Sequence, residues 1–122
     1  YNDAFGHLAG DTVLMRVANL LGQKCKTGQE SVFRLGGEEF VMTQQVPSPE
    51  YACGFAANLL QDVEELRIKA GIDTASQWVT ISCGITIVPP TDTTTSNLAL
   101  IDQADKAMYQ AKISGRNCSK SH

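Results

Sequence analysis

The strongest constraint on the fold is the segment of residues 78–88, in which two kinds of side chain alternate strictly. The odd-numbered positions are apolar or cysteine: Val79, Ile81, Cys83, Ile85 and Ile87. The even-numbered positions from 78 to 86 are occupied by Trp78, Thr80, Ser82, Gly84 and Thr86. Successive side chains of a β-strand point to opposite faces of a sheet. This period of two therefore predicts a strand with one buried face.

A second β-rich region surrounds two adjacent glycines. The short β-prone runs 32–35 and 40–43 are separated by Gly36, Gly37, Glu38 and Glu39. Two strands joined by a glycine-containing turn form a hairpin. We therefore expect the two glutamates at the tip of a hairpin or in the first residues after it.

Three further segments carry apolar residues at steps of three and four, which is typical of an amphipathic helix. We expect these helices over residues 11–24, from the break at Pro47–Glu50 to Gly71, and from a cap at Ser96 or Asn97 to Gly115. The order is then helix, hairpin, helix, strand, helix. Helices packed on one face of a mainly antiparallel sheet give an α+β fold. With 122 residues, 43% of them hydrophobic, we expect one domain over residues 1–122.

The composition excludes several functions. A net charge of -3 gives no general attraction to nucleic acid or to an anionic membrane. No apolar run approaches the ~20 residues that span a bilayer. The four cysteines form no CxxC pair and have no histidine nearby, which argues against zinc and favours free thiols in a reducing cytoplasm.

The segment Gly36–Glu39 has two interpretations. It can be a plain hairpin turn with solvated carboxylates. Alternatively, the glycines let a phosphate ester approach the backbone while a carboxylate just beyond them holds Mg²⁺, which prefers oxygen ligands. Neighbouring strand residues point to opposite faces, so Glu38 and Glu39 are not expected to do the same job.

The N-terminal segment gathers several polar side chains. Each has a local explanation as a helix cap, a turn residue or a locally bonded histidine. Together they could recognise a purine, because an Asn amide donates and accepts while a carboxylate accepts from the N1 and N2 hydrogens of guanine. The candidates are Asn2, Asp3, His7, Asp11 and Thr12.

Two cations lie near the end of the last predicted helix. Lys112 and Arg116 can simply complement the helix dipole there. Their alternative role is to hold the terminal phosphates of a nucleoside triphosphate.

The motifs YNDAFGHLAGD, RLGGEEF and ADKAMYQAKISGRN occur in this order and cover practically the whole chain. Together they resemble the GGDEF family of diguanylate cyclases, in its GGEEF form. The resemblance implies a fold similar to the adenylyl cyclase core and the polymerase palm. It also implies a bacterial signalling enzyme in which two GTP molecules, one on each domain of a homodimer, are condensed to cyclic di-GMP. Mg²⁺ or Mn²⁺ would be the cofactor.

Residue by residue, the resemblance implies roles for each motif. Asn2 and Asp11 would hydrogen-bond guanine, with His7 near the same pocket, and Gly36 and Gly37 would admit the triphosphate. Glu38 would bind metal and act as the base toward the 3′-hydroxyl, while Glu39 would be a second candidate metal ligand or a support. The terminal phosphates would be held by Lys112 and Arg116.

Two departures from the family pattern accompany this resemblance. The family has a strand ending in a metal-binding aspartate just upstream of the position of Asn2, and this sequence begins after it. We therefore expect a GGDEF domain that lacks its first strand, and a chain that is inactive by itself. Upstream of GGEEF many members carry an RxxD product-inhibition motif, whereas this chain reads Thr27-Gly28-Gln29-Glu30. We therefore expect that inhibitory site to be missing.

Two alternatives to an active cyclase follow from the same residues. The chain could be a catalytically silent GTP-binding module that controls a neighbouring domain, or a purely structural dimerisation domain. For the active cyclase and for both alternatives, we expect a cytoplasmic domain that is attached to an upstream sensor domain. The parent protein could be anchored in the inner membrane.

Overall fold

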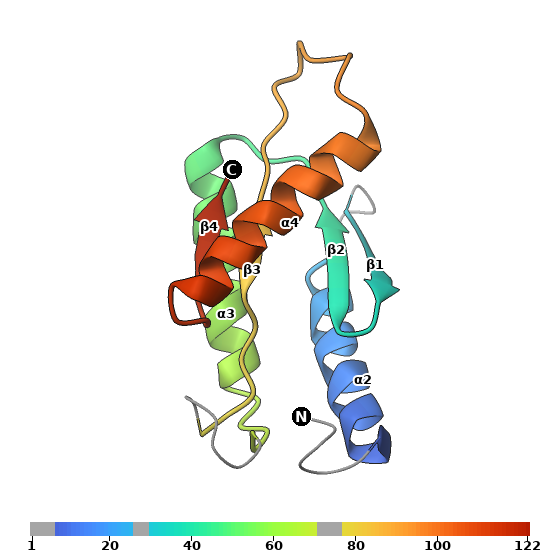
Figure 1. The fold of residues 1–122 in the computed structure, drawn as a ribbon, viewed down its shortest axis with the longest axis vertical. Coiled ribbons are helices and arrows are strands. Elements are labelled where there is room, and N and C mark those ends of the chain that lie inside the picture. Colours follow the sequence, from blue (N-terminus) through green and yellow to red (C-terminus); the bar gives the residue numbers. More distant parts are fainter. Residues whose placement is uncertain (1–6, 26–29, 71–76) are drawn as a thin grey trace. The chain divides into compact units, whose positions relative to one another are not determined.

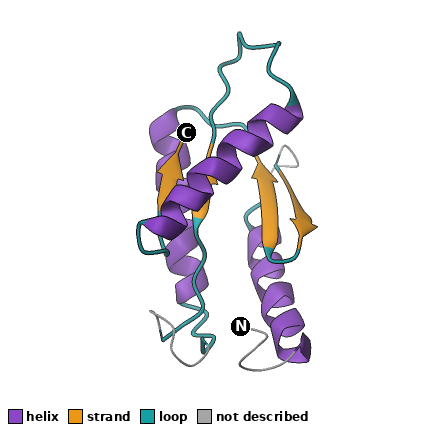
Figure 2. Ribbon diagram, viewed as in Figure 1, coloured by secondary structure: helices purple, strands orange, loops and turns teal. Residues whose placement is uncertain are grey.

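The computed structural model describes residues 7–25, 30–70 and 77–122, with side chains from residue 10 onward in the first range. Within these described ranges, four elements lie before residue 70 and three after it. Figure 1 shows them in the colours of the sequence. In chain order they are α2 (His7–Gln23), β1 (Ser31–Gly36), β2 (Glu39–Thr43), α3 (Pro49–Glu64), β3 (Cys83–Ile85), α4 (Asn97–Ile113) and β4 (Ser119–Ser121). The α+β class is as predicted, with helices and short strands coloured separately in Figure 2.

The chain divides into two compact units. The N-terminal unit comprises Tyr1–Gln45 and Val63–Val79, and the C-terminal unit comprises Val46–Asp62 and Thr80–His122. Each unit has buried apolar side chains of its own. That the whole chain forms one domain stays a prediction.

The core of the N-terminal unit is built on α2. Val13, Val17 and Leu21 follow one another at four-residue steps and are all buried. Val63 and Ile68 complete this core, and Val63 is fully enclosed. The structure begins α2 at His7, earlier than the predicted start at Asp11. Gly10 lies in the helix at a buried position, although glycine costs a helix interior about 1 kcal/mol relative to alanine.

The hairpin of β1 and β2 is antiparallel, as predicted. Its register pairs Ser31 with Thr43, and the hydroxyl oxygens of these two side chains lie 2.7 Å apart at the open end. The pairing continues through Phe33–Val41 and Arg34–Phe40, and then shifts before the last pair, Gly36–Glu39.

The helix α3 ends at Glu64, so the predicted extension to Gly71 was wrong. The chain turns at Arg67, whose φ is +54°, and the following residues pair with the segment 77–79 instead. The amide of Val79 donates to the carbonyl of Ile68 at 2.7 Å, and the amide of Ala70 donates to that of Gln77 at 3.0 Å. The Arg67 guanidinium lies 5.3 Å from the centre of the Trp78 ring, which is cation–π distance.

The C-terminal unit contains the strand predicted from the alternating pattern, but only Cys83–Ile85 of the predicted segment 78–88 is a strand. It pairs in parallel with β4, which was not predicted. The backbone amide of Cys83 donates to the carbonyl of Cys118 at 3.0 Å, and the backbone amide of His122 donates to the carbonyl of Ile85 at 2.8 Å. The strand is therefore as long as the partner segment that reaches it.

The helix α4 connects these two parallel strands and packs on β3 (Figure 1). Its predicted cap is confirmed, because the Ser96 hydroxyl accepts a hydrogen bond from the Ala99 amide at 3.1 Å. Its predicted end at Gly115 agrees with a helix that ends at Ile113 and a glycine φ of +113°. Buried residues Ala56, Leu59, Ala107 and Ala111 form the core of this unit.

Two further expectations concerned the state of the cysteines and the presence of a membrane-spanning segment. All four cysteines are free thiols. Burial raises the pKa of the Cys83 thiol to about 11, with a smaller contribution from the nearby Cys118. Of the helices that the structure describes, none combines the length and the apolar character needed to cross a bilayer.

We predict that Gly84→Ala destabilises the C-terminal unit. A Cβ at Gly84 would overlap the backbone carbonyl of Ala104 and the backbone nitrogen of Met108. Since backbone atoms of a packed helix cannot move away cheaply, we expect a loss of about 1–3 kcal/mol in the free energy of unfolding, measured in urea. Gly54→Ala is the matched control, because a Cβ there meets nothing within 4 Å and alanine favours the helix α3. Equal stability of the two variants would contradict this account of β3 and α4.

We predict an unusually acidic carboxyl in the loop before α4. The hydroxyl of Thr95 donates to Asp92 at 2.6 Å, and the amides of Thr94 and Thr95 add two more hydrogen bonds. These bonds lower the pKa of Asp92 to about 2. They stabilise the folded loop above the ordinary pKa near 3.8, and this contribution is lost as pH falls toward 2.

An NMR titration tests this loop. Thr95→Val should raise the pKa of Asp92 toward its ordinary value, because the hydroxyl donor is removed. Thr93→Val is the control and should leave the pKa unchanged. The explanation fails if Asp92 titrates at the same pH with and without the Thr95 hydroxyl.

Candidate functional site

The hairpin tip places the two glutamates where the sequence predicted them. Because Gly36 pairs with Glu39, the residues between them, Gly37 and Glu38, form a two-residue turn. Gly37 has a φ of +52°, a conformation that glycine adopts without steric cost and that suits the first position of such a turn. Glu38 is exposed in the turn itself, and Glu39 is the half-buried first residue of β2.

One side chain of the hairpin reaches back to this turn. The Nε of Arg34 donates a hydrogen bond to the carbonyl oxygen of Gly37 at 2.9 Å. Arg34 is the last β1 residue in the regular register, paired with Phe40. The carbonyl of the residue directly before Glu38 is therefore held by a charged donor from the same hairpin.

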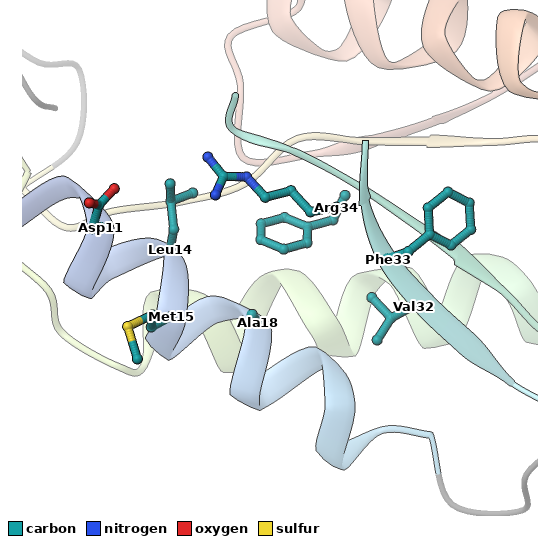
Figure 3. A pocket seen from close by; sticks show the side chains of 8 residues that line it. Asp11, Leu14, Met15, Ala18, Val32, Phe33 and Arg34 are labelled. Carbon is teal, nitrogen blue, oxygen red and sulfur yellow. The ribbon is translucent and has the colours of Figure 1, made fainter. Parts of the chain in front are cut away.

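A pocket of about 320 Å³ lies between α2 and the hairpin (Figure 3). Its wall is mostly apolar, and Asp11 and Arg34 are the charged residues that line it. In Figure 3 the Arg34 side chain extends from β1 toward the α2 side of the pocket, where Asp11 and Leu14 lie. The lining residues are Asp11, Leu14, Met15, Ala18, Val32, Phe33, Arg34 and Phe40. Apolar walls with a few oriented polar groups are usual for small-molecule sites of this size.

The predicted purine-binding residues are described only in part. Asp11 is exposed on α2 and lines this pocket. His7 is the first residue of α2, and its side chain lies outside the described part, as does the whole of Asn2. Residues 27–29 of the segment that corresponds to the RxxD motif also lie outside the described residues.

The predicted phosphate-binding cations belong to the C-terminal unit. Lys112 lies in the last turn of α4, and Arg116 follows the helix with a φ of +64°. Both are exposed, and the Arg116 amide donates to the carbonyl of Ala111 at 3.0 Å. The backbone thus turns back at the end of the helix, and the two cations lie four positions apart in the chain.

The donor set for a metal is small. Among the described residues, no group of three or more His, Cys, Asp or Glu side chains could hold an ion. Glu38 and Glu39 are neighbours in the chain, one in the turn and one on β2. Any ion held here would need oxygen ligands from a substrate or water in addition to these carboxylates.

Arg34 and Phe40 shape this site, and no role was predicted for them from the sequence although both belong to the RLGGEEF motif. The signal that could have found them is the hairpin register, which places residues at equal distances from the turn opposite each other. Leu14 was predicted only as a core residue of the first helix, and it also lines the pocket.

Comparison with known proteins decides the family. A family model described as "Diguanylate cyclase, GGDEF domain" matches residues 1–118 of the 122. The chain belongs to this GGDEF family.

Two curated relatives show how much of a longer protein the GGDEF match covers. Diguanylate cyclase A of Treponema denticola is 35% identical over 116 residues, which are 95% of this chain and 30% of that protein. Diguanylate cyclase DgcZ of Escherichia coli is 33% identical over 116 residues, 95% of this chain and 37% of that protein. The chain thus spans about a third of the length of these relatives.

Solved structures of GGDEF domains share the fold. The active GGEEF domain of a diguanylate cyclase from Vibrio cholerae superposes with a TM-score of 0.76 at 28% identity, covering 98% of this chain and 72% of that one. The GGDEF domain of DgcB from Caulobacter crescentus, solved in complex with c-di-GMP, gives a TM-score of 0.81 at 27% identity, covering 98% and 66%. The palm-like α+β fold predicted from the sequence is therefore confirmed.

Proposed function

We propose that this chain is the catalytic domain of a diguanylate cyclase, which condenses two GTP molecules to cyclic di-GMP and releases two pyrophosphates. The observation that carries the proposal is the tip of the hairpin, Gly36–Gly37–Glu38. This glycine turn exposes the Glu38 carboxylate on the same hairpin that lines the pocket. Family membership and the names of the relatives support it.

The pocket of the N-terminal unit supplies recognition of the base. The carboxylate of Asp11 can accept hydrogen bonds from N1–H and N2–H of guanine, whereas adenine offers no such pair of donors. The apolar wall provides contact area for a flat ring. Asn2 and His7 are proposed to complete this recognition.

The glycines and Glu38 act at the reacting phosphate. Gly36 and Gly37 carry no side chain, so the triphosphate can pass close to the backbone of the turn. Each 3′-hydroxyl attacks the α-phosphate of the opposite GTP, a new P–O bond forms, and the bond between the α- and β-phosphates breaks. We assign to Glu38 the acceptance of the hydroxyl proton and to Lys112 and Arg116 the binding of the terminal phosphates.

The carboxylates at the tip fit a divalent metal. Mg²⁺ and Mn²⁺ prefer oxygen ligands, and Mg²⁺ is usually held by one or two carboxylates together with substrate phosphates. Glu38, with Glu39 as the second candidate ligand, provides such a set. When bound, the ion would stabilise the negative charge that develops at the α-phosphate.

The reaction implies a homodimer. Each domain would hold one GTP, and the product forms only when two loaded domains face each other. Regulation by an upstream sensor domain would act on this encounter.

The direct test is incubation of the full-length protein with GTP and Mg²⁺, with separation of the nucleotides by chromatography. We expect cyclic di-GMP and pyrophosphate from GTP and no cyclic dinucleotide from ATP. The specific activity should rise with protein concentration, because dimerisation precedes the reaction. If GTP raises the melting temperature but is not consumed at any protein concentration, the protein is instead a silent GTP-binding module. No GTP-dependent rise in melting temperature would leave a structural dimerisation domain.

We predict that Glu38→Gln lowers kcat by at least about 100-fold, because the amide neither accepts the proton nor binds metal well. GTP affinity, measured by thermal shift, should change much less, since the base contacts are retained. Glu50→Gln is the control: Glu50 is exposed in the first turn of α3, and kcat should stay unchanged. Undiminished turnover in Glu38→Gln would refute the role of Glu38.

A further inference from the structure

Arg34 is the charged residue of the site to which neither the motifs nor the proposed reaction gives a role. It lies on β1, three residues before Gly37, and its Nε donates to the Gly37 carbonyl at 2.9 Å. It also lines the pocket together with Asp11. Its guanidinium therefore touches both the turn that presents Glu38 and the space in which a nucleotide base would lie.

The turn needs such a contact. Two adjacent glycines have the widest conformational freedom of any dipeptide, so the backbone before Glu38 is intrinsically loose. The ladder offers little help, because its register shifts between Arg34 and Gly36 and Leu35 has no partner in the regular pairing. Beyond the Arg34–Phe40 pair, only Gly36–Glu39 joins the two strands.

The bond from Arg34 acts at the position that this looseness affects most. The Gly37 carbonyl belongs to the peptide bond that leads into Glu38, so fixing it fixes the orientation of that peptide. A hydrogen bond from a charged donor is stronger than one between neutral groups, and the planar guanidinium gives it a defined direction. Lysine could reach the same carbonyl only with a rotating ammonium group.

We propose that Arg34 is a positioning residue that holds the Gly36–Gly37 turn and thereby aims the Glu38 carboxylate at the reacting phosphate. This inference rests on the proposed cyclase function. It predicts that loss of the guanidinium slows the chemical step without weakening the binding of GTP.

The test compares the full-length wild-type protein with Arg34→Gln. We expect kcat to fall about tenfold, the change that one charge-assisted hydrogen bond is worth, while KM for GTP stays within about twofold. Amide hydrogen exchange, followed by NMR, should become faster at Glu38 and Glu39 and stay unchanged in α2. The kcat and the exchange rates of Arg34→Lys should lie between those of wild type and Arg34→Gln, because lysine restores a donor without the planar geometry.

Arg16→Gln is the matched control. Arg16 belongs to the same unit and loses the same charge, but its guanidinium donates to the Leu66 carbonyl at 3.5 Å, away from the turn. Exchange at Glu38 and Glu39 should be the same in this variant as in wild type, and so should kcat.

Two results would overturn the inference. One is unchanged exchange at the tip in Arg34→Gln, and the other is a raised KM with an unchanged kcat, which would make Arg34 a ligand contact. A wild-type protein that forms no cyclic di-GMP contradicts the proposed function alone, because the exchange measurement decides separately whether Arg34 holds the turn.

Discussion

The need of every β-strand for a hydrogen-bonded partner shapes both units of this protein. The segment 78–88 has the alternation of a long strand, yet only Cys83–Ile85, which faces β4, adopts that structure. Residues 68–70 leave the helical path and pair with 77–79 for the same reason. Backbone amides and carbonyls must be paired when they leave water, so the available partner, and not the side-chain pattern alone, sets the length of each strand.

Pairing also accounts for the position of the candidate catalytic carboxylate. The antiparallel register of β1 and β2 leaves two residues for the turn, and Gly37 meets the positive φ required there. Glu38 is thereby exposed without the desolvation that a buried carboxylate would suffer. The glycines weaken this end of the strands, and in the proposed function they make room for a phosphate. The Arg34 side chain donates a hydrogen bond to the Gly37 carbonyl in the same turn.

In the C-terminal unit, individual residues fix how β3 packs on α4 and where α4 begins and ends. Gly84 lets β3 lie directly against the backbone of α4, which no residue with a Cβ could do. Ser96 and the Asp92–Thr95 loop fix the start of α4, and Gly115 ends it. Lys112 and Arg116 consequently lie at a defined helix end, where positive charge complements the helix dipole.

The amino-acid sequence was enough to predict the α+β class, the hairpin with its glutamates at the tip, the caps of α4 and the three motifs of the GGDEF family. Each of these depends on residues close together in the chain, through periodicity, turn conformation or capping. The tertiary structure was needed to show that α3 ends at Glu64, that β4 pairs in parallel with β3, and that α2 and the hairpin enclose a pocket lined by Asp11 and Arg34. These features depend on which distant segment offers a backbone partner or a packing surface, and no local pattern records that.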